Sequence, residues 1–257
     1  YFDEINTIDV YLLNGSLSSV TELALLNGAN TCYIDGEVIQ FQNVTVLDGD
    51  PKKLRLSRLL RGRLGTEWAC ESAHIYGSEF TFLNPNVMKM DIPVNLFNNP
   101  RYYKAVSLGQ TLASTEEELF TYRAIKLKPY SVVHITSDRH IPASNDWTIS
   151  WVRRTRVNGD WLDLVGEVPL NEEVEAYEID IYDGVTVVRT LTSNSPTVVY
   201  TEADQIADFG SAQSVLVLKI YQLSAVIGRG YEASSIMTEG TSTGGEPIGL
   251  LLTLTRA

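Results

Sequence analysis

The chain has 257 residues and a formal net charge of −12. That length allows two modest domains or one large β domain. The acidic balance argues against nucleic acid or an anionic membrane as a partner, because both favour a basic face. No stretch has the roughly 20 apolar residues that a membrane helix needs, and no signal-peptide pattern opens the chain. Because the first residue is Tyr1 and not Met, we expect a fragment or a processed product.

Short strand signals dominate residues 1–100. Residues 31–41 are typical of a hairpin, because Asp35-Gly36 interrupts them with a strong turn signal. Residues 17–26 have apolar spacing that fits a short helix or a strand. The other expected strands lie beside turn residues, at 44–47, 54–59, 79–83 and 87–92. We therefore expect a small, mostly β domain of barrel or sandwich type.

Residues 101–128 are predicted to connect two domains. Strand signals at 101–108 and 119–127 flank a polar turn at Ser114–Glu118, which indicates a connecting hairpin. This hairpin completes the first domain or bridges to the next one. The sequence leaves both arrangements open.

Residues 129–237 show strand signals at roughly 8–12-residue spacing, which is typical of a β-sandwich. Trp147 and Trp151 alternate with polar residues on one strand, so we expect both in the core. The region resembles a fibronectin type III domain, although it lacks the Cys…Trp…Cys set of antibody domains. Residues 238–257 are expected to form a polar linker and one last apolar strand at 248–255, which should pair with a partner.

A basic run follows the first hairpin and contains no acidic residue. Its members are Lys52, Lys53, Arg55, Arg58, Arg61 and Arg63. A phosphate groove is one interpretation, but no aromatic residue is interleaved with these cations. The other is that the arginines pair with acids of the same domain or of a neighbouring subunit, because Arg binds carboxylates bidentately and is favoured at interfaces. We predict Arg55, Arg58, Arg61 and Arg63 as assembly or interface residues.

The same run carries a family resemblance. Residues 34–41 (IDGEVIQF) and 55–68 (RLSRLLRGRLGTEW) resemble a block of phage tail hub and tip proteins, including the large tail-tip protein of gene transfer agents. Further similarity, in WVRRTR, GDWLD, VPL and ADFG, extends it over roughly residues 28–236. The resemblance implies a virion structural protein at the tail tip or baseplate hub. It also implies a homotrimer around the tail axis that contacts other distal tail proteins (hub, tail fibre, tape measure) and a host-surface glycan.

No pattern of catalytic or metal-binding residues stands out. His74, His134 and His140 lack ligand spacing, and they are interpreted as solvated or strand residues. The acidic runs 116–118 and 172–173 are interpreted as solvated turns. Asp48-Gly49-Asp50 lacks the downstream Glu of an EF-hand and reads as hairpin chemistry. Cys32 and Cys70 do not make a disulfide framework, and their redox state stays open.

We therefore expect a non-enzymatic tail-tip or baseplate-hub component without cofactor or metal, located in the virion and acting in distal tail assembly and host attachment. The alternative is a carbohydrate-binding module of a cell-surface or wall-degrading protein. Trp161, in the loop after Val157, and Arg229, in a Gly-Arg-Gly turn, are predicted to contact a surface. A hydrolase is disfavoured because neither a nucleophile motif nor a metal set is visible.

Overall fold

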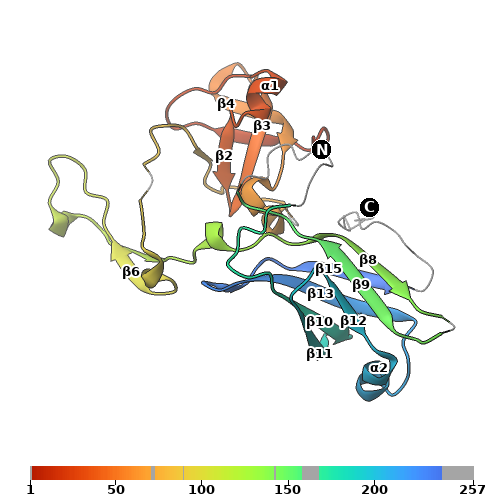
Figure 1. Cartoon of the computed structure of the whole chain (residues 1–257). Coiled ribbons are helices and arrows are strands. Elements are labelled where there is room, and N and C mark those ends of the chain that lie inside the picture. Colours follow the sequence, from red (N-terminus) through yellow and green to blue (C-terminus); the bar gives the residue numbers. More distant parts are fainter. Residues whose placement is uncertain (1, 71–72, 89, 142, 158–167, 239–257) are drawn as a thin grey trace. The chain divides into compact units, whose positions relative to one another are not determined.

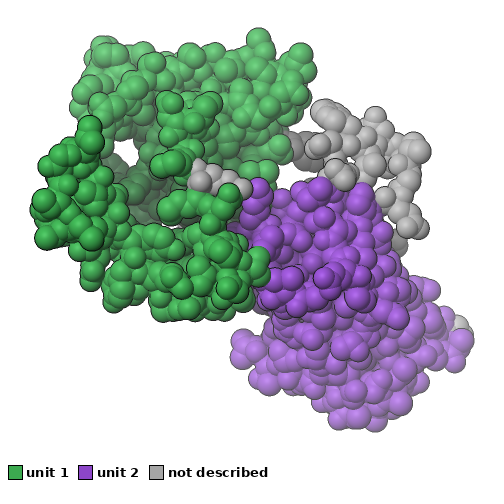
Figure 2. Space-filling view, turned by 60° about the vertical axis from the view of Figure 1, so that its left-hand side comes forward, with its two compact units in different colours: residues 1–123 green, residues 124–257 purple. Residues whose placement is uncertain are grey.

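The computed structural model describes residues 2–70, 73–88, 90–141, 143–157 and 168–238. The chain divides into two compact units, residues 1–123 and 124–257, coloured green and purple in Figure 2. Antiparallel strands build both units, so the predicted mostly β class is confirmed. Trp161 and the final strand predicted at 248–255 lie outside the described residues.

The first unit contains a five-stranded antiparallel sheet in the order β1-β4-β3-β2-β5 (Figure 1). Its strands are β1 (Ile8–Tyr11), β2 (Thr31–Ile34), β3 (Glu37–Leu47), β4 (Asp50–Leu60) and β5 (Thr81–Phe82). The turn at Asp35-Gly36 joins β2 to β3, and the turn at Asp48-Gly49 joins β3 to β4. All four turn residues have a positive φ, as a tight type I′ hairpin requires.

On β4, the regular alternation of buried and exposed side chains is interrupted. Leu56 and Leu59 are both fully buried although they are three residues apart. A regular strand would place them on opposite faces, since its side chains alternate with a period of two. Arg58 lies between them with φ 56°. The left-handed backbone conformation of Arg58 shifts the alternation of side chains on β4. Both leucines therefore point into the same core, while the Arg58 side chain points out of it.

Two local expectations in the first unit are settled. Within residues 17–26 the chain forms a short helix, α1 (Glu22–Leu26). The side chain of Thr21 caps it by accepting a hydrogen bond from the Ala24 N–H at 3.2 Å. The prediction of a strand at 87–92 was wrong, because none of the described residues in this range forms a strand. The Val87 N–H instead closes a turn onto the carbonyl of Asn84 at 3.0 Å, so it cannot begin a ladder there.

The predicted hairpin after residue 100 is present but shorter than expected. It consists of β6 (Pro100–Tyr103) and β7 (Glu118–Thr121), which pair antiparallel. A 3₁₀ turn, η4 (Leu112–Ser114), lies in the long connection between them. Figure 1 shows this two-stranded ribbon in yellow and yellow-green, and no other described strand pairs with it. We call residues 100–121 the ribbon.

The second unit is a two-layer sandwich. One sheet has the order β12-β9-β8, and the other has β11-β10-β13 with β15 on the far side of β13. In the usual immunoglobulin lettering, β8, β9 and β12 are strands A, B and E of one layer. Strands β11, β10, β13 and β15 are C′, C, F and G of the other layer. This is the expected immunoglobulin-like arrangement. The strands are β8 (Val133–Arg139), β9 (Trp147–Val152), β10 (Tyr177–Asp183), β11 (Thr186–Ser193), β12 (Thr197–Tyr200), β13 (Val215–Ser224), β14 (Gly228–Arg229) and β15 (Ala233–Thr238).

Aromatic residues hold the two layers of the sandwich together. Trp147 and Trp151 of β9 are buried in its core, as predicted. The Trp151 ring meets Tyr177 of the opposite layer edge to face, with centroids 5.0 Å apart. This is a favoured aromatic geometry. The inward residues of β9 and β10 therefore interdigitate as their period-two patterns predict.

A helix that sequence reasoning did not predict follows β12. It is α2 (Glu202–Phe209), and the hydroxyl of Thr201 caps it by accepting from the Asp204 N–H at 3.1 Å. Gly210 ends the helix with φ 78°, a conformation in which glycine carries no Cβ penalty. No described helix is both long enough and apolar enough to cross a bilayer.

Candidate functional site

The basic run lies along β4 and the turn that follows it. Arg55 stands directly opposite Asp9 of β1. Its guanidinium donates two hydrogen bonds of 2.7 Å to that carboxylate. Both side chains are about half exposed. This is therefore a surface ion pair, of a kind that contributes little to stability.

Arg58 joins three segments of the first unit. Its guanidinium lies 4.0 Å from the centre of the Phe2 ring, a cation–π contact. It also donates to Glu4 and to Glu22 at 2.8 Å each, and to the amide oxygen of Gln42. One side chain therefore fastens the start of the chain and helix α1 to the central sheet.

Arg61 belongs to a buried polar cluster around Glu37. The Glu37 side chain is fully buried. It accepts from Arg61 Nε at 2.7 Å and from Arg61 Nη2 at 2.6 Å. The Gly62 N–H donates to Glu37 Oε1 at 2.8 Å, and the Cys70 thiol donates to the same oxygen at 3.0 Å. His74 Nε2 lies 2.8 Å from Glu37 Oε2. We call these five residues the Glu37 cluster.

The charge state of the Glu37 cluster follows from these contacts. Burial alone would raise the pKa of Glu37, but the hydrogen bonds from Arg61, Cys70 and the Gly62 N–H outweigh it and hold this pKa below its ordinary value. Burial and the neighbouring Glu37 carboxylate raise the pKa of the Cys70 thiol to about 12. The cluster is therefore a carboxylate–guanidinium pair with a protonated, unreactive thiol beside it.

Glycine is required at position 62 of this corner. Its φ is 58°, and an added Cβ would lie 2.9 Å from Cys70 Sγ and 3.0 Å from the Glu67 Cα. The next residue, Arg63, donates to the side-chain oxygen of Gln40 at 2.8 Å. Gln40 is itself buried and donates to the Leu25 carbonyl at 2.7 Å. The turn after β4 is thus fixed to the sheet by its side chains.

The four predicted arginines therefore have partners within their own unit. Arg55, Arg58 and Arg61 pair with acids of the same unit, whereas Arg63 pairs with the amide of Gln40. An interface role for them stays a prediction. Sequence reasoning missed Cys70 and His74. His74 was expected to be solvated or in a strand, and that was wrong, because its side chain is 15% exposed and lies against Glu37.

Arg229 lies in the sandwich and is also paired. It donates to both oxygens of Asp180, at 2.6 and 3.0 Å, and to Glu178 at 2.5 Å. Its guanidinium stacks 4.5 Å from the centre of the Tyr221 ring. The side chain is 40% exposed, so contact with an outside surface stays a prediction.

The prediction that the acidic run 172–173 lies in a solvated turn was wrong for Glu172. Glu172 was expected in a solvated turn, but its side chain is 7% exposed and pairs with Arg156. Within the part of the chain that the structure describes, no group of three or more His, Cys, Asp or Glu residues is arranged to hold a metal ion.

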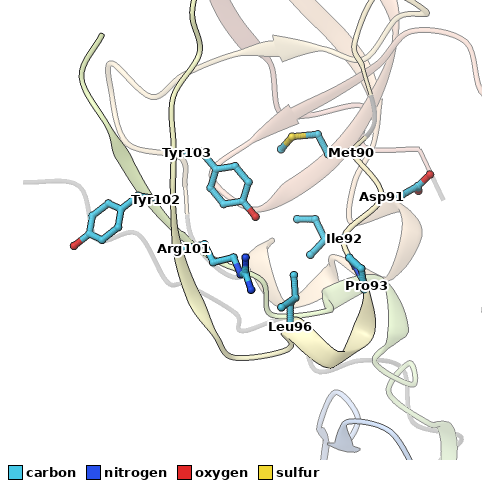
Figure 3. Close-up of a pocket in the computed structure, with 8 residues that line it drawn as sticks. All are labelled: Met90, Asp91, Ile92, Pro93, Leu96, Arg101, Tyr102 and Tyr103. Carbon is cyan, nitrogen blue, oxygen red and sulfur yellow. The ribbon is translucent and has the colours of Figure 1, made fainter. Parts of the chain in front are cut away.

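The ribbon is the other candidate site. One of its faces, together with residues 90–96, lines an open cavity of about 420 Å³. Figure 3 shows Met90, Ile92, Leu96 and Tyr103 turned toward this space. Arg101 and Tyr102 also belong to the lining, but the ring of Tyr102 points outward. On the other face Tyr102 stands opposite Leu119. These two side chains are 66% and 56% exposed.

Comparison with known proteins gives a family-model match and matches to solved structures. Residues 1–81 match the family model described as "Rcc01698-like, C-terminal". The crystal structure of the rat CD45 extracellular region, domains d3-d4, is similar with 13% sequence identity and a TM-score of 0.31. That match covers 61% of this chain and 72% of the CD45 chain. No curated protein gives a significant match.

Proposed function

We propose that the chain is a structural component of the tail tip or baseplate hub of a phage or phage-like particle, acting in distal tail assembly and host-cell attachment. The observation that carries this proposal is the ribbon. A two-stranded ribbon is marginally stable alone in water, and exposed apolar patches mark interaction surfaces. Its segment and the preceding loop expose several large apolar side chains: Met88, Met90, Tyr102, Leu108, Leu112, Leu119 and Phe120.

The residues that resemble tail-tip proteins also support a structural role. They form the β3–β4 hairpin and the corner after it, where Arg61 and Glu37 bind each other and not a ligand. A buried carboxylate that accepts from four neighbouring groups holds its corner rigid. The block that carries the resemblance therefore supplies a stiff platform.

The proposed partners follow from the resemblance and from charge. The chain forms a homotrimer around the tail axis and contacts the hub, tail-fibre and tape-measure proteins, while the distal side meets host-surface glycan. A net charge of −12 disfavours nucleic acid as a further partner.

Quantitative mass spectrometry of purified particles from the encoding organism tests the proposal. We expect the chain among the virion proteins, in low copy number and in a multiple of three. Its absence from particles that contain other tail proteins would refute the proposal. A glycan array tests the carbohydrate-binding alternative, which predicts selective binding of the isolated chain that is lost in a Trp161→Ala variant.

A further inference from the structure

Both strands of the ribbon have an open edge. Among the described strands, β6 pairs only with β7 and β7 only with β6. Pro100 begins β6, and proline is found at the start of a strand or on edge strands because it cannot donate to a ladder. In an antiparallel pair, alternate residues point their backbone N–H and C=O groups away from the partner, so part of residues 101–103 offers such groups on the outer side of the ribbon. Open edges of this kind pair with another strand unless something protects them.

The two edges carry opposite charges. β6 contains Arg101, and Lys104 follows it, whereas Glu116 and Glu117 lead into β7, which begins at Glu118. Lys104 and Glu117 are 3.9 Å apart within one chain. Among the described residues, Arg101, Glu116 and Glu118 form no ion pair. One basic edge and one acidic edge therefore retain unpaired charge.

We propose that the basic edge of β6 pairs with the acidic edge of β7 in the next copy of this chain. Three ribbons joined head to tail then close into a six-stranded ring with no free edge. This inference rests on the proposed function for the number of copies, and it adds the surface through which they meet. Head-to-tail contacts close into a ring when their rotation permits it.

The apolar residues of the ribbon suit such a ring. Tyr102 and Leu119 stand opposite each other and so share one face. Tyr102 is part of the cavity lining, and Figure 3 shows that its ring points outward from the cavity. In the ring this face turns toward the axis, where three copies bury one another's side chains. Pairing two β6 edges instead would place arginine near arginine, which like-charge repulsion opposes.

Charge reversal tests the head-to-tail pairing in the full chain. Sedimentation equilibrium of the unchanged protein should give three times the mass of one chain. Arg101→Glu and Glu118→Lys should each weaken association by roughly tenfold or more, because like charges then meet at the contact. The double variant should regain association. Arg101 and Glu118 are diagonal neighbours on one face of the ribbon within one chain. The Arg101→Glu and Glu118→Lys chains are therefore also mixed, because part of the association should return in the mixture only through contact between copies.

Lys53→Glu is the matched control, since it makes the same charge change on β4, outside the ribbon. It should leave association unchanged, and circular dichroism should show every variant folded. A monomeric wild type, or single and double variants that associate alike, would overturn the ring. Particles that contain the chain despite such a result would leave the proposed function standing. Conversely, charge rescue in a chain absent from particles would support the ring and refute the tail role.

Discussion

Glu37 and Arg61 form a bidentate ion pair across the β3–β4 hairpin, with N–O distances of 2.7 and 2.6 Å. The carboxylate is fully buried, and the arginine side chain is 23% exposed. Burial removes both groups from water, so each depends on the other for compensation. Both residues belong to the block that resembles tail-tip proteins, and their ion pair assigns a structural role to two charged residues of that block.

Arg61→Ala should destabilise the first unit by about 3–5 kcal/mol, because it leaves a buried carboxylate without its cation. Urea unfolding followed by circular dichroism measures this change. Arg55→Ala is the control on the same strand, because the Arg55–Asp9 pair is exposed, and its effect should be far smaller. Equal effects of the two substitutions would mean that the Glu37 cluster does not hold this unit together.

Acid should weaken the first unit through Glu37. Its folded pKa lies below the ordinary value of 4.5. Its contribution to stability is therefore complete above pH 4.5 and is lost as the pH falls through the lower folded pKa. Unfolding free energies measured from pH 6 downward should show this loss. Glu37→Gln should flatten the dependence below pH 4.5, and an unchanged slope would contradict the assignment.

The two thiols should react slowly in the folded chain. Both cysteines are free, and burial raises the pKa of Cys32, like that of Cys70, to about 12. At pH 8 almost no thiolate is present to react with a disulfide reagent. Two thiols per chain should react rapidly only after urea has unfolded the protein. Glu37→Gln should speed the reaction of Cys70, since it removes the charge that opposes thiolate formation, and should affect Cys32 less.

Trp151→Ala should destabilise the sandwich by about 3–5 kcal/mol, because the ring fills the space between the two layers. Thermal melting of the full chain, with the two units resolved, checks this value. Val185→Ala is the control, since Val185 is 95% exposed, and it should change stability by less than about 0.5 kcal/mol. A loss below about 1 kcal/mol for Trp151→Ala would place its ring outside the core.

Local patterns predicted much of the fold. The Asp-Gly turns and the alternation through Trp147 and Trp151 depend on neighbouring residues alone, so their hairpins and core strands could be read from the sequence. Helix α2 was missed although Thr201 and Gly210 are its capping signals, because its eight residues are shorter than the stretch over which a helical period is recognised. The positive φ of Arg58 was also invisible, since tertiary contacts with Phe2, Glu4 and Glu22 hold it.

In the candidate sites, too, features set by neighbouring residues were predictable and features set by tertiary contacts were not. The basic run is obvious in the sequence, and pairing of its arginines with acids of their own domain was one of the interpretations weighed. Which acids they pair with was not predictable, because Glu37 and Arg61 meet only through the register of β3 and β4. Cys70 and His74 reach the cluster from a turn and a following segment without a regular period. No sequence pattern pointed to them, because the burial of Glu37 is visible only in the folded chain.

The location of the chain in the virion tests the central claim most directly. Antibodies raised against the purified chain, bound to intact particles and seen by immunogold electron microscopy, should label the distal end of the tail and no other part. Antibodies absorbed with the same chain should abolish the label. Gold along the tail shaft or on the capsid, or particles left unlabelled after mild opening of the tip, would contradict a tail-tip role.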